Sequence, residues 1–153
     1  MLKKGDLVPD FELPDEDGTP RKLSDLLANG PAVLFFYPAA MTYGCTKESC
    51  HFRDLKAEFE EIGAQRVGIS ADKVEKQKQF SEKESFDFPL LSDADGTVAS
   101  EMGVRRSLVK VNKRATFVID TDRHIIEVIH SEVSMRGHAD RALEVLRRRR
   151  AAA

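Results

Sequence analysis

Two cysteines carry the most reactive side chains in this sequence. Cys45 follows a continuously apolar segment, residues 32–37, and precedes residues with helical spacing. We therefore predict that Cys45 lies in the first turn of a helix, where unpaired backbone N–H groups and the helix dipole favour negative charge. A thiolate held there is a nucleophile, because the thiolate rather than the thiol reacts. A buried cysteine with a purely structural role is the alternative.

Cys50 stands five residues after Cys45. In an ideal helix that spacing separates the two Cα atoms by roughly 8–9 Å. A disulfide requires Cα atoms within about 7 Å. The two cysteines therefore cannot bond while the helix is intact, and any bond between them requires the first turns to unwind. The alternative is that Cys50 is simply a small core residue.

Metal binding is a competing use of the same segment. Cys45, Cys50 and His51 could supply three ligands, at a spacing within the range of structural zinc sites. No second ligand cluster stands at a readable spacing, so we expect no metal and no cofactor. A total of 2 cysteines also excludes a disulfide-stapled secreted scaffold and a four-cysteine zinc or iron–sulfur site.

The segments that must position the cysteines alternate between strand and helix patterns. The first predicted element is a small hairpin among the turn residues Pro9, Pro14, Asp17-Gly18 and Pro20. It is followed by a helical turn at 24–27, a central strand at 32–37, and a helix from Cys45 to Gly63 with Phe52, Leu55, Phe59 and Ile62 on its inner face. The later elements are a strand at 66–70, a helix at 73–84, a short strand or extended piece at 88–91, a short helix at 98–102, a hairpin of strands 115–120 and 125–130, and a last helix carrying Ala139, Leu143 and Leu146. This order predicts a layered α/β fold. We expect one domain over residues 1–153, with an Arg/Ala-rich C-terminal tail at 147–153.

The composition narrows the class of partner and the compartment. The 153 residues include 24 Lys and Arg against 26 Asp and Glu, a net charge of −2. Such a balance gives no general attraction to nucleic acid or to an anionic membrane. The start of the chain is charged, and the longest apolar stretch is too short to span a bilayer. We therefore expect a soluble cytoplasmic protein, where thiols stay reduced and a close cysteine pair is catalytic, redox-sensing or metal-binding.

The residues around the cysteines resemble a known family. Pro38–Cys45 resembles the P-x-x-x-T-x-x-C signature of the peroxiredoxins, and Cys45–Asp54 resembles their peroxiredoxin Q subfamily, also called bacterioferritin comigratory protein. Members of that subfamily often carry a second cysteine five residues after the first. Residues 114–120 resemble the family's R-x-T-F-x-I-D strand, and Gly5–Phe11 resembles its start. Tyr43 departs from the subfamily, which usually has proline at this position. We expect this difference to loosen the loop or to change how a hydroperoxide enters.

This resemblance implies a thioredoxin-like fold, with a central mixed β-sheet flanked by helices, and a thiol-dependent peroxidase. Its substrates would be hydrogen peroxide and organic hydroperoxides. The implied catalytic residues are Cys45, Cys50, Thr42, Arg114 and Pro38. Cys45 would be the peroxidatic cysteine and Cys50 the resolving cysteine, joined by an intrachain disulfide intermediate.

The side chains around Cys45 each have a role that their chemistry suits. Arg114 would hold the thiolate by charge and donate to peroxide oxygens through its fixed fork of N–H groups. Thr42 would orient the peroxide through its hydroxyl, and could also cap the helix. Pro38 would shield the cysteine from water, or simply end the strand. Glu48 either orients groups near the first turn or faces solvent.

The expected partners follow from the same resemblance. Thioredoxin or a similar dithiol protein would reduce the disulfide, without any cofactor. We expect no nucleic acid and no membrane partner, and a monomer or a weak homodimer.

Two other functions compete with this one. A thioredoxin-like dithiol oxidoreductase would favour C-x-x-C over the C-x₄-C seen here. A nucleic-acid-binding module could use Arg147–Arg150. That run equally suits a cluster of cations that complements the end of a helix.

Overall fold

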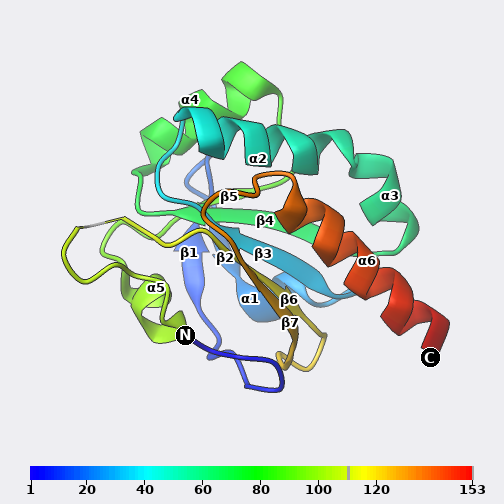
Figure 1. Ribbon diagram of the computed structural model, residues 1–153. Helices are drawn as coiled ribbons and strands as arrows, with labels where there is room; N and C mark the ends of the chain where they lie inside the picture. The colour runs from blue at the N-terminus through cyan, green and yellow to red at the C-terminus, as the bar shows by residue number, and fades with distance from the viewer. Residues whose placement is uncertain (110, 153) are drawn as a thin grey trace.

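The computed structural model describes residues 1–109 and 111–152. The described residues form a two-stranded sheet, a five-stranded sheet and six helices (Figure 1). In chain order the elements are β1 Glu12–Pro14, β2 Pro20–Lys22, α1 Leu23–Leu26, β3 Ala32–Phe36, α2 Tyr43–Asp54, α3 Lys56–Glu61, β4 Gln65–Ser70, α4 Val74–Glu84, β5 Leu90–Ser92, α5 Thr97–Met102, β6 Ala115–Ile119, β7 Ile125–His130 and α6 Gly137–Ala152. The strands and helices alternate as the sequence pattern predicted.

A mixed five-stranded sheet forms the centre, in the order β5-β4-β3-β6-β7. Strand β3 is parallel to β4 and antiparallel to β6, and β6 and β7 form the predicted hairpin. All five residues of β3 are buried, as expected for a continuously apolar strand covered on both faces. The short strands β1 and β2 form a separate antiparallel pair near the N-terminus.

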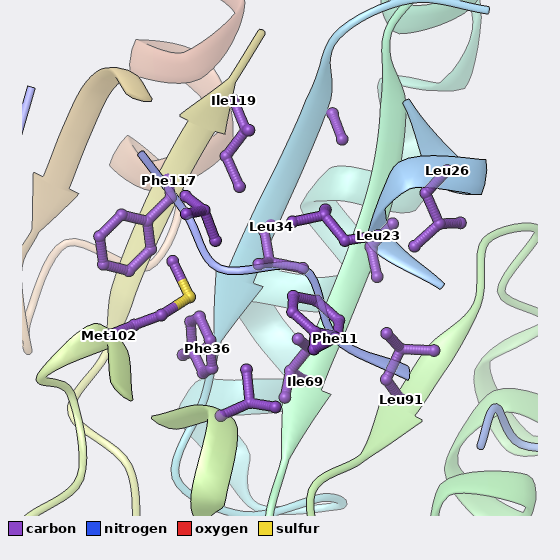
Figure 2. Close-up of a cluster of buried hydrophobic side chains, with 14 of the residues drawn as sticks. Phe11, Leu23, Leu26, Leu34, Phe36, Ile69, Leu91, Met102, Phe117 and Ile119 are labelled. Atoms are coloured by element: carbon purple, nitrogen blue, oxygen red, sulfur yellow. The ribbon is translucent and has the colours of Figure 1, made fainter. Parts of the chain in front are cut away.

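Successive side chains of β3 point to opposite faces of the sheet and build two separate cores. Val33 and Phe35 belong to a cluster with residues of α2, α3, α4 and α6, which cover one face. Leu34 and Phe36 belong to the opposite cluster, which includes residues of α1 and α5 and is drawn in Figure 2. The central strand is therefore held from both sides, and the loop that follows it starts from a rigid base.

The helix predicted from Cys45 to Gly63 is wrong as one continuous element. Helix α2 ends at Asp54, and α3 begins at Lys56 after a non-helical Leu55. The Phe52 carbonyl, near the end of α2, accepts a hydrogen bond of 2.8 Å from the Arg66 guanidinium. This buried donor satisfies a carbonyl that a continuing helix would have paired internally. Phe52 and Phe59 are both fully buried, so the predicted inner face is kept across the break.

The Arg/Ala-rich residues predicted as a C-terminal tail continue α6 as far as Ala152. Arg149 pairs with Asp120, and Arg150 donates to the Glu61 carbonyl at 3.1 Å. Ala153, the last residue of the predicted tail, lies outside the described residues. Within the described chain, no helix combines the length and the apolarity needed to cross a membrane.

The ring of Phe52 ties α2 to the central strand, and its removal should be costly. It stacks on the ring of Phe35 with centroids 4.2 Å apart and is fully buried. We expect Phe52→Ala to lower the free energy of unfolding by about 3–5 kcal/mol, measured by urea denaturation. Val133→Ala, at a side chain that is 87% exposed, should change it by less than about 0.5 kcal/mol. Equal losses in the two variants would contradict this assignment.

Candidate active site

Cys45 is the third residue of α2, as predicted, and its side chain is only 1% exposed. The first backbone bond of this helix runs from the Thr46 N–H to the Thr42 carbonyl, at 2.9 Å. The backbone N–H groups of residues 43–45 therefore precede the internal bonding of the helix and are available to an oxygen or sulfur anion.

Arg114 is the principal polar partner of the Cys45 sulfur. It immediately precedes β6, and it is 5% exposed. Its Nη2–H donates to Cys45 Sγ at 3.5 Å, and its Nη1–H donates to Glu48 Oε1 at 3.0 Å. A Cβ atom on Gly44 would lie 3.2 Å from Arg114 Nη2, so the lack of a side chain there leaves room for the guanidinium. Arg114 is thus a buried residue and not a surface arginine at the start of a strand.

Glu48 is fully buried, so the alternative in which it faces solvent is wrong. It lies three residues after Cys45 on α2, a spacing that turns both side chains to the same face. Burial raises the pKa of Glu48 to about 8, although the neighbouring Arg114 opposes this shift. The spacing from Cys45 was the available sequence signal, but it could not reveal that a guanidinium would meet this face.

Thr42 and Pro38 bound the loop that leads into α2. Thr42 occupies the N-cap position with extended backbone, but its hydroxyl donates to the Ala39 carbonyl at 2.8 Å and does not cap the helix. The hydroxyl oxygen keeps its capacity to accept a hydrogen bond. Pro38 is half-buried and lies two residues after the end of β3. Tyr43 begins the helix with an exposed side chain, at the position where proline's fixed φ is favoured.

An aspartate that the sequence reasoning missed holds this loop in place. Met41 has φ of 62°, a left-handed conformation that is uncommon for a residue with a side chain and must be held by its surroundings. Asp72 Oδ2 accepts hydrogen bonds from the Ala40 N–H at 2.7 Å and from Ser70 Oγ at 2.6 Å. Strands β3 and β4 are parallel, so Asp72, after β4, meets the loop after β3 at the same sheet edge.

Cys50 lies on the same helix in a different electrostatic environment. Its half-buried thiol donates to Glu84 Oε2, on α4, at 3.3 Å. Burial, together with this hydrogen bond to a carboxylate, raises the pKa of Cys50 to about 11. Both cysteines are free thiols. The Cys50 side chain is therefore partly buried, and its thiol also makes a polar contact with α4.

The residues weighed as metal ligands do not come together. His51 Nε2 contacts Asp140 Oδ1 at 2.7 Å, whereas Cys45 and Cys50 face Arg114 and Glu84. Within the described ranges, the grouping of metal-type ligands is a different one, formed by Asp15, Glu16 and Asp17. Arg21 and Lys78 already pair with two of those carboxylates.

Known proteins match this chain in sequence and in fold over nearly its whole length. A Mycobacterium tuberculosis protein named as a peroxiredoxin is 64% identical over 149 residues, covering 95% of this chain and 97% of that protein. The crystal structure of peroxidoxin BcpB from Mycobacterium tuberculosis matches with a TM-score of 0.93 at 63% identity, covering 97% of this chain and 98% of that one. Xanthomonas campestris bacterioferritin comigratory protein, solved for insights into its alkyl peroxide reduction activity, matches with a TM-score of 0.84 at 30% identity, covering 91% of each chain.

The fold is the thioredoxin-like fold of the peroxiredoxins, and the chain belongs to the AhpC/TSA family, whose profile matches residues 4–128. Its relatives specify the branch more closely. It is a peroxiredoxin of the bacterioferritin comigratory protein, or peroxiredoxin Q, type, and its enzyme activity is that of a peroxidase.

The Arg114 guanidinium is the contact whose loss should most affect reaction with peroxide. We expect Arg114→Gln to lower the rate of peroxide consumption roughly 10²–10³-fold, because a charged donor aimed at developing negative charge is removed. Arg148→Gln is the matched control, since Arg148 is an exposed partner of Glu144 on α6 and should leave the rate unchanged. An unchanged rate in Arg114→Gln, with circular dichroism showing an intact fold, would contradict this role.

Proposed function

We propose that Cys45 is the peroxidatic cysteine of this peroxidase. In the first step the Cys45 thiolate attacks one peroxide oxygen, the O–O bond breaks, and the leaving oxygen takes a proton to give water or an alcohol. Cys45 becomes a sulfenic acid. The contact between Arg114 and the Cys45 sulfur is the single observation that carries this assignment, because it puts a permanent positive charge where both thiolate and leaving oxygen need one.

Thr42 and Pro38 complete the proposed site from the loop that leads into α2. The Thr42 hydroxyl is held toward the loop by its bond to the Ala39 carbonyl, which leaves its oxygen to accept from a hydroperoxide O–H. Pro38 contributes no N–H and limits the water that reaches the loop. The backbone N–H groups at the start of α2 add donors for the peroxide oxygen.

In the second step we propose that Cys50 resolves the sulfenic acid. The Cys50 sulfur bonds to the Cys45 sulfur, and the sulfenic oxygen leaves as water. Both residues lie within α2, so its first turns must open before the sulfur atoms meet. Phe52, stacked on Phe35, anchors the rest of the helix, and the opening can therefore stop short of it.

We propose that a dithiol protein of the thioredoxin type closes the cycle. One of its thiolates attacks the Cys45–Cys50 disulfide, and its second thiol releases the reduced enzyme. Such a donor is available in a reducing cytoplasm, where we place the reaction. For substrates we propose hydrogen peroxide and organic hydroperoxides. The activity named for the Xanthomonas campestris relative, alkyl peroxide reduction, supports the second of these classes.

Peroxide consumption coupled to NADPH through thioredoxin and its reductase tests this cycle. We expect Cys45→Ser to abolish activity, because serine lacks the thiolate. We expect Cys50→Ser to complete one turnover and then stop, because the sulfenic acid is no longer resolved within the chain. Sustained catalysis by Cys45→Ser would overturn the proposal, and so would reduction of insulin disulfides without any peroxide reduction.

The contact between Cys50 and Glu84 gives a second test, directed at the resolving step. A pKa of about 11 keeps Cys50 protonated at neutral pH, so the rate of disulfide formation should rise with pH in the intact enzyme. We expect Glu84→Gln to accelerate disulfide formation roughly 3–10-fold at pH 7, because a thiol–carboxylate bond that pins Cys50 to α4 is weakened. The step is followed by thiol titration after a single addition of peroxide.

Glu82→Gln is the matched control for that experiment. Glu82 lies on the same helix as Glu84, is exposed, and pairs with Lys78. Its substitution should leave the rate of disulfide formation unchanged. A slower rate in Glu84→Gln would contradict the pinning role and would make Glu84 a proton acceptor for Cys50.

A further inference from the structure

A buried histidine lies behind the active site and has no part in the cycle described above. His138 is the second residue of α6 and is 0% exposed. Its Nε2 lies 2.8 Å from the Ser131 carbonyl oxygen. Because a carbonyl can only accept a hydrogen bond, Nε2 must carry the proton. Burial lowers the pKa of His138, which favours the neutral ring.

A neutral ring with its proton on Nε2 has a hydrogen-bond acceptor, a single lone pair, at Nδ1. The Thr116 hydroxyl lies 2.8 Å from this Nδ1 and donates to it. Glu48 Oε2 lies 3.5 Å from the same atom. The Ser131 carbonyl therefore fixes the tautomer of His138, and this tautomer presents a hydrogen-bond acceptor to the Glu48 carboxyl.

The oxygen of Glu48 that faces His138 is itself unusual. Oε2 is buried and, among the described residues, has no hydrogen-bond partner, whereas Oε1 accepts from Arg114. If Glu48 were ionised, Oε2 would be a buried acceptor placed against the Nδ1 acceptor, with no donor to satisfy it. A proton on Oε2 lessens that conflict, because it removes the negative charge and its O–H can share the Nδ1 lone pair that already accepts from Thr116.

The charges around this pair come from four parts of the fold. The titratable and charged groups that face Glu48 and His138 are Cys45 from α2, Arg114 ahead of β6, His130 from the end of β7, and Glu132 from the segment before α6. Only Arg114 favours an ionised Glu48, while Glu132 opposes it. A protonated Glu48 is thus favoured by burial, by Glu132 and by the tautomer of His138.

We propose that His138 is a positioning residue that keeps Glu48 protonated and so reserves the positive charge of Arg114 for the Cys45 sulfur and the peroxide. Loss of the Glu48 proton to solvent base creates a carboxylate that competes with them for the same guanidinium. The inference rests on Cys45 as the residue that reacts with peroxide, and it is independent of Cys50 and of the reductant.

The proposal predicts an alkaline limb in the first chemical step. Glu48, with a pKa of about 8, is neutral below that pH and ionises above it. The rate of Cys45 oxidation by hydrogen peroxide should therefore fall as the pH rises through about 8. The rate is measured without reductant, by competition with a peroxidase of known rate between about pH 6 and 10.

Two variants separate this role from a structural one. We expect Glu48→Gln to lose the alkaline decline, because the amide stays neutral at every pH. We expect His138→Asn to move the decline about one pH unit lower, because its amide can offer an N–H donor to a Glu48 carboxylate. A rate that His138→Asn lowers equally at all pH values, with the decline unmoved, would overturn the proposal.

A measurement on the unaltered protein keeps the proposal falsifiable if His138→Asn does not fold. The carboxyl carbon of Glu48, assigned by its loss in Glu48→Gln, is followed by ¹³C NMR through the same pH range. A titration midpoint near pH 8 is expected, and a carboxylate already ionised at pH 6 would overturn the proposal. Failure of Cys45→Ser to stop peroxide reduction would instead refute the proposed function, since that result does not depend on the state of Glu48.

Discussion

A guanidinium group withdrawn from water is the constraint on which the rest of this structure depends. Arg114 keeps its charge at any physiological pH, so its burial requires partners that offset the lost hydration. Helix α2 supplies them from one face, with the Cys45 sulfur and the Glu48 carboxyl three residues apart. Bringing α2 against the residue ahead of β6 requires the antiparallel pairing of β3 with β6, and the central sheet provides it.

The two cysteines of α2 lie only five residues apart, but their electrostatic environments are opposite. Cys45 faces a cation in the protein interior, whereas Cys50 faces the Glu84 carboxylate beside α4. The second environment favours a protonated thiol, because burial and the hydrogen bond to Glu84 raise the pKa of Cys50. One helix thus presents its two cysteines to groups of opposite charge, which suits the order of steps in the proposed cycle.

The segment that contains α2 is held by tertiary contacts at both of its ends. The loop before α2 is fixed by Asp72, and the end of α2 is fixed by the Phe52 stack and by the Arg66 bond to the Phe52 carbonyl. Between these anchors lie the turns that carry both cysteines. An opening confined to those turns would bring Cys45 and Cys50 together and leave the stack of Phe52 on Phe35 in place.

The sequence by itself determined most of the secondary-structure elements and the family to which the chain belongs. Periodicity located the central strand and the helix start at Cys45, because those features depend on neighbours along the chain. The resemblance around Pro38, Thr42, Cys45 and Arg114 identified the family. The break at Leu55, by contrast, depends on Arg66, whose guanidinium arrives from another strand. The burial of Glu48 and the contacts of Asp72, Glu84 and His138 were likewise decided only by tertiary structure. Each results from side chains distant in sequence meeting in a region without water, where an unpaired polar group is costly, and no local pattern encodes such a meeting.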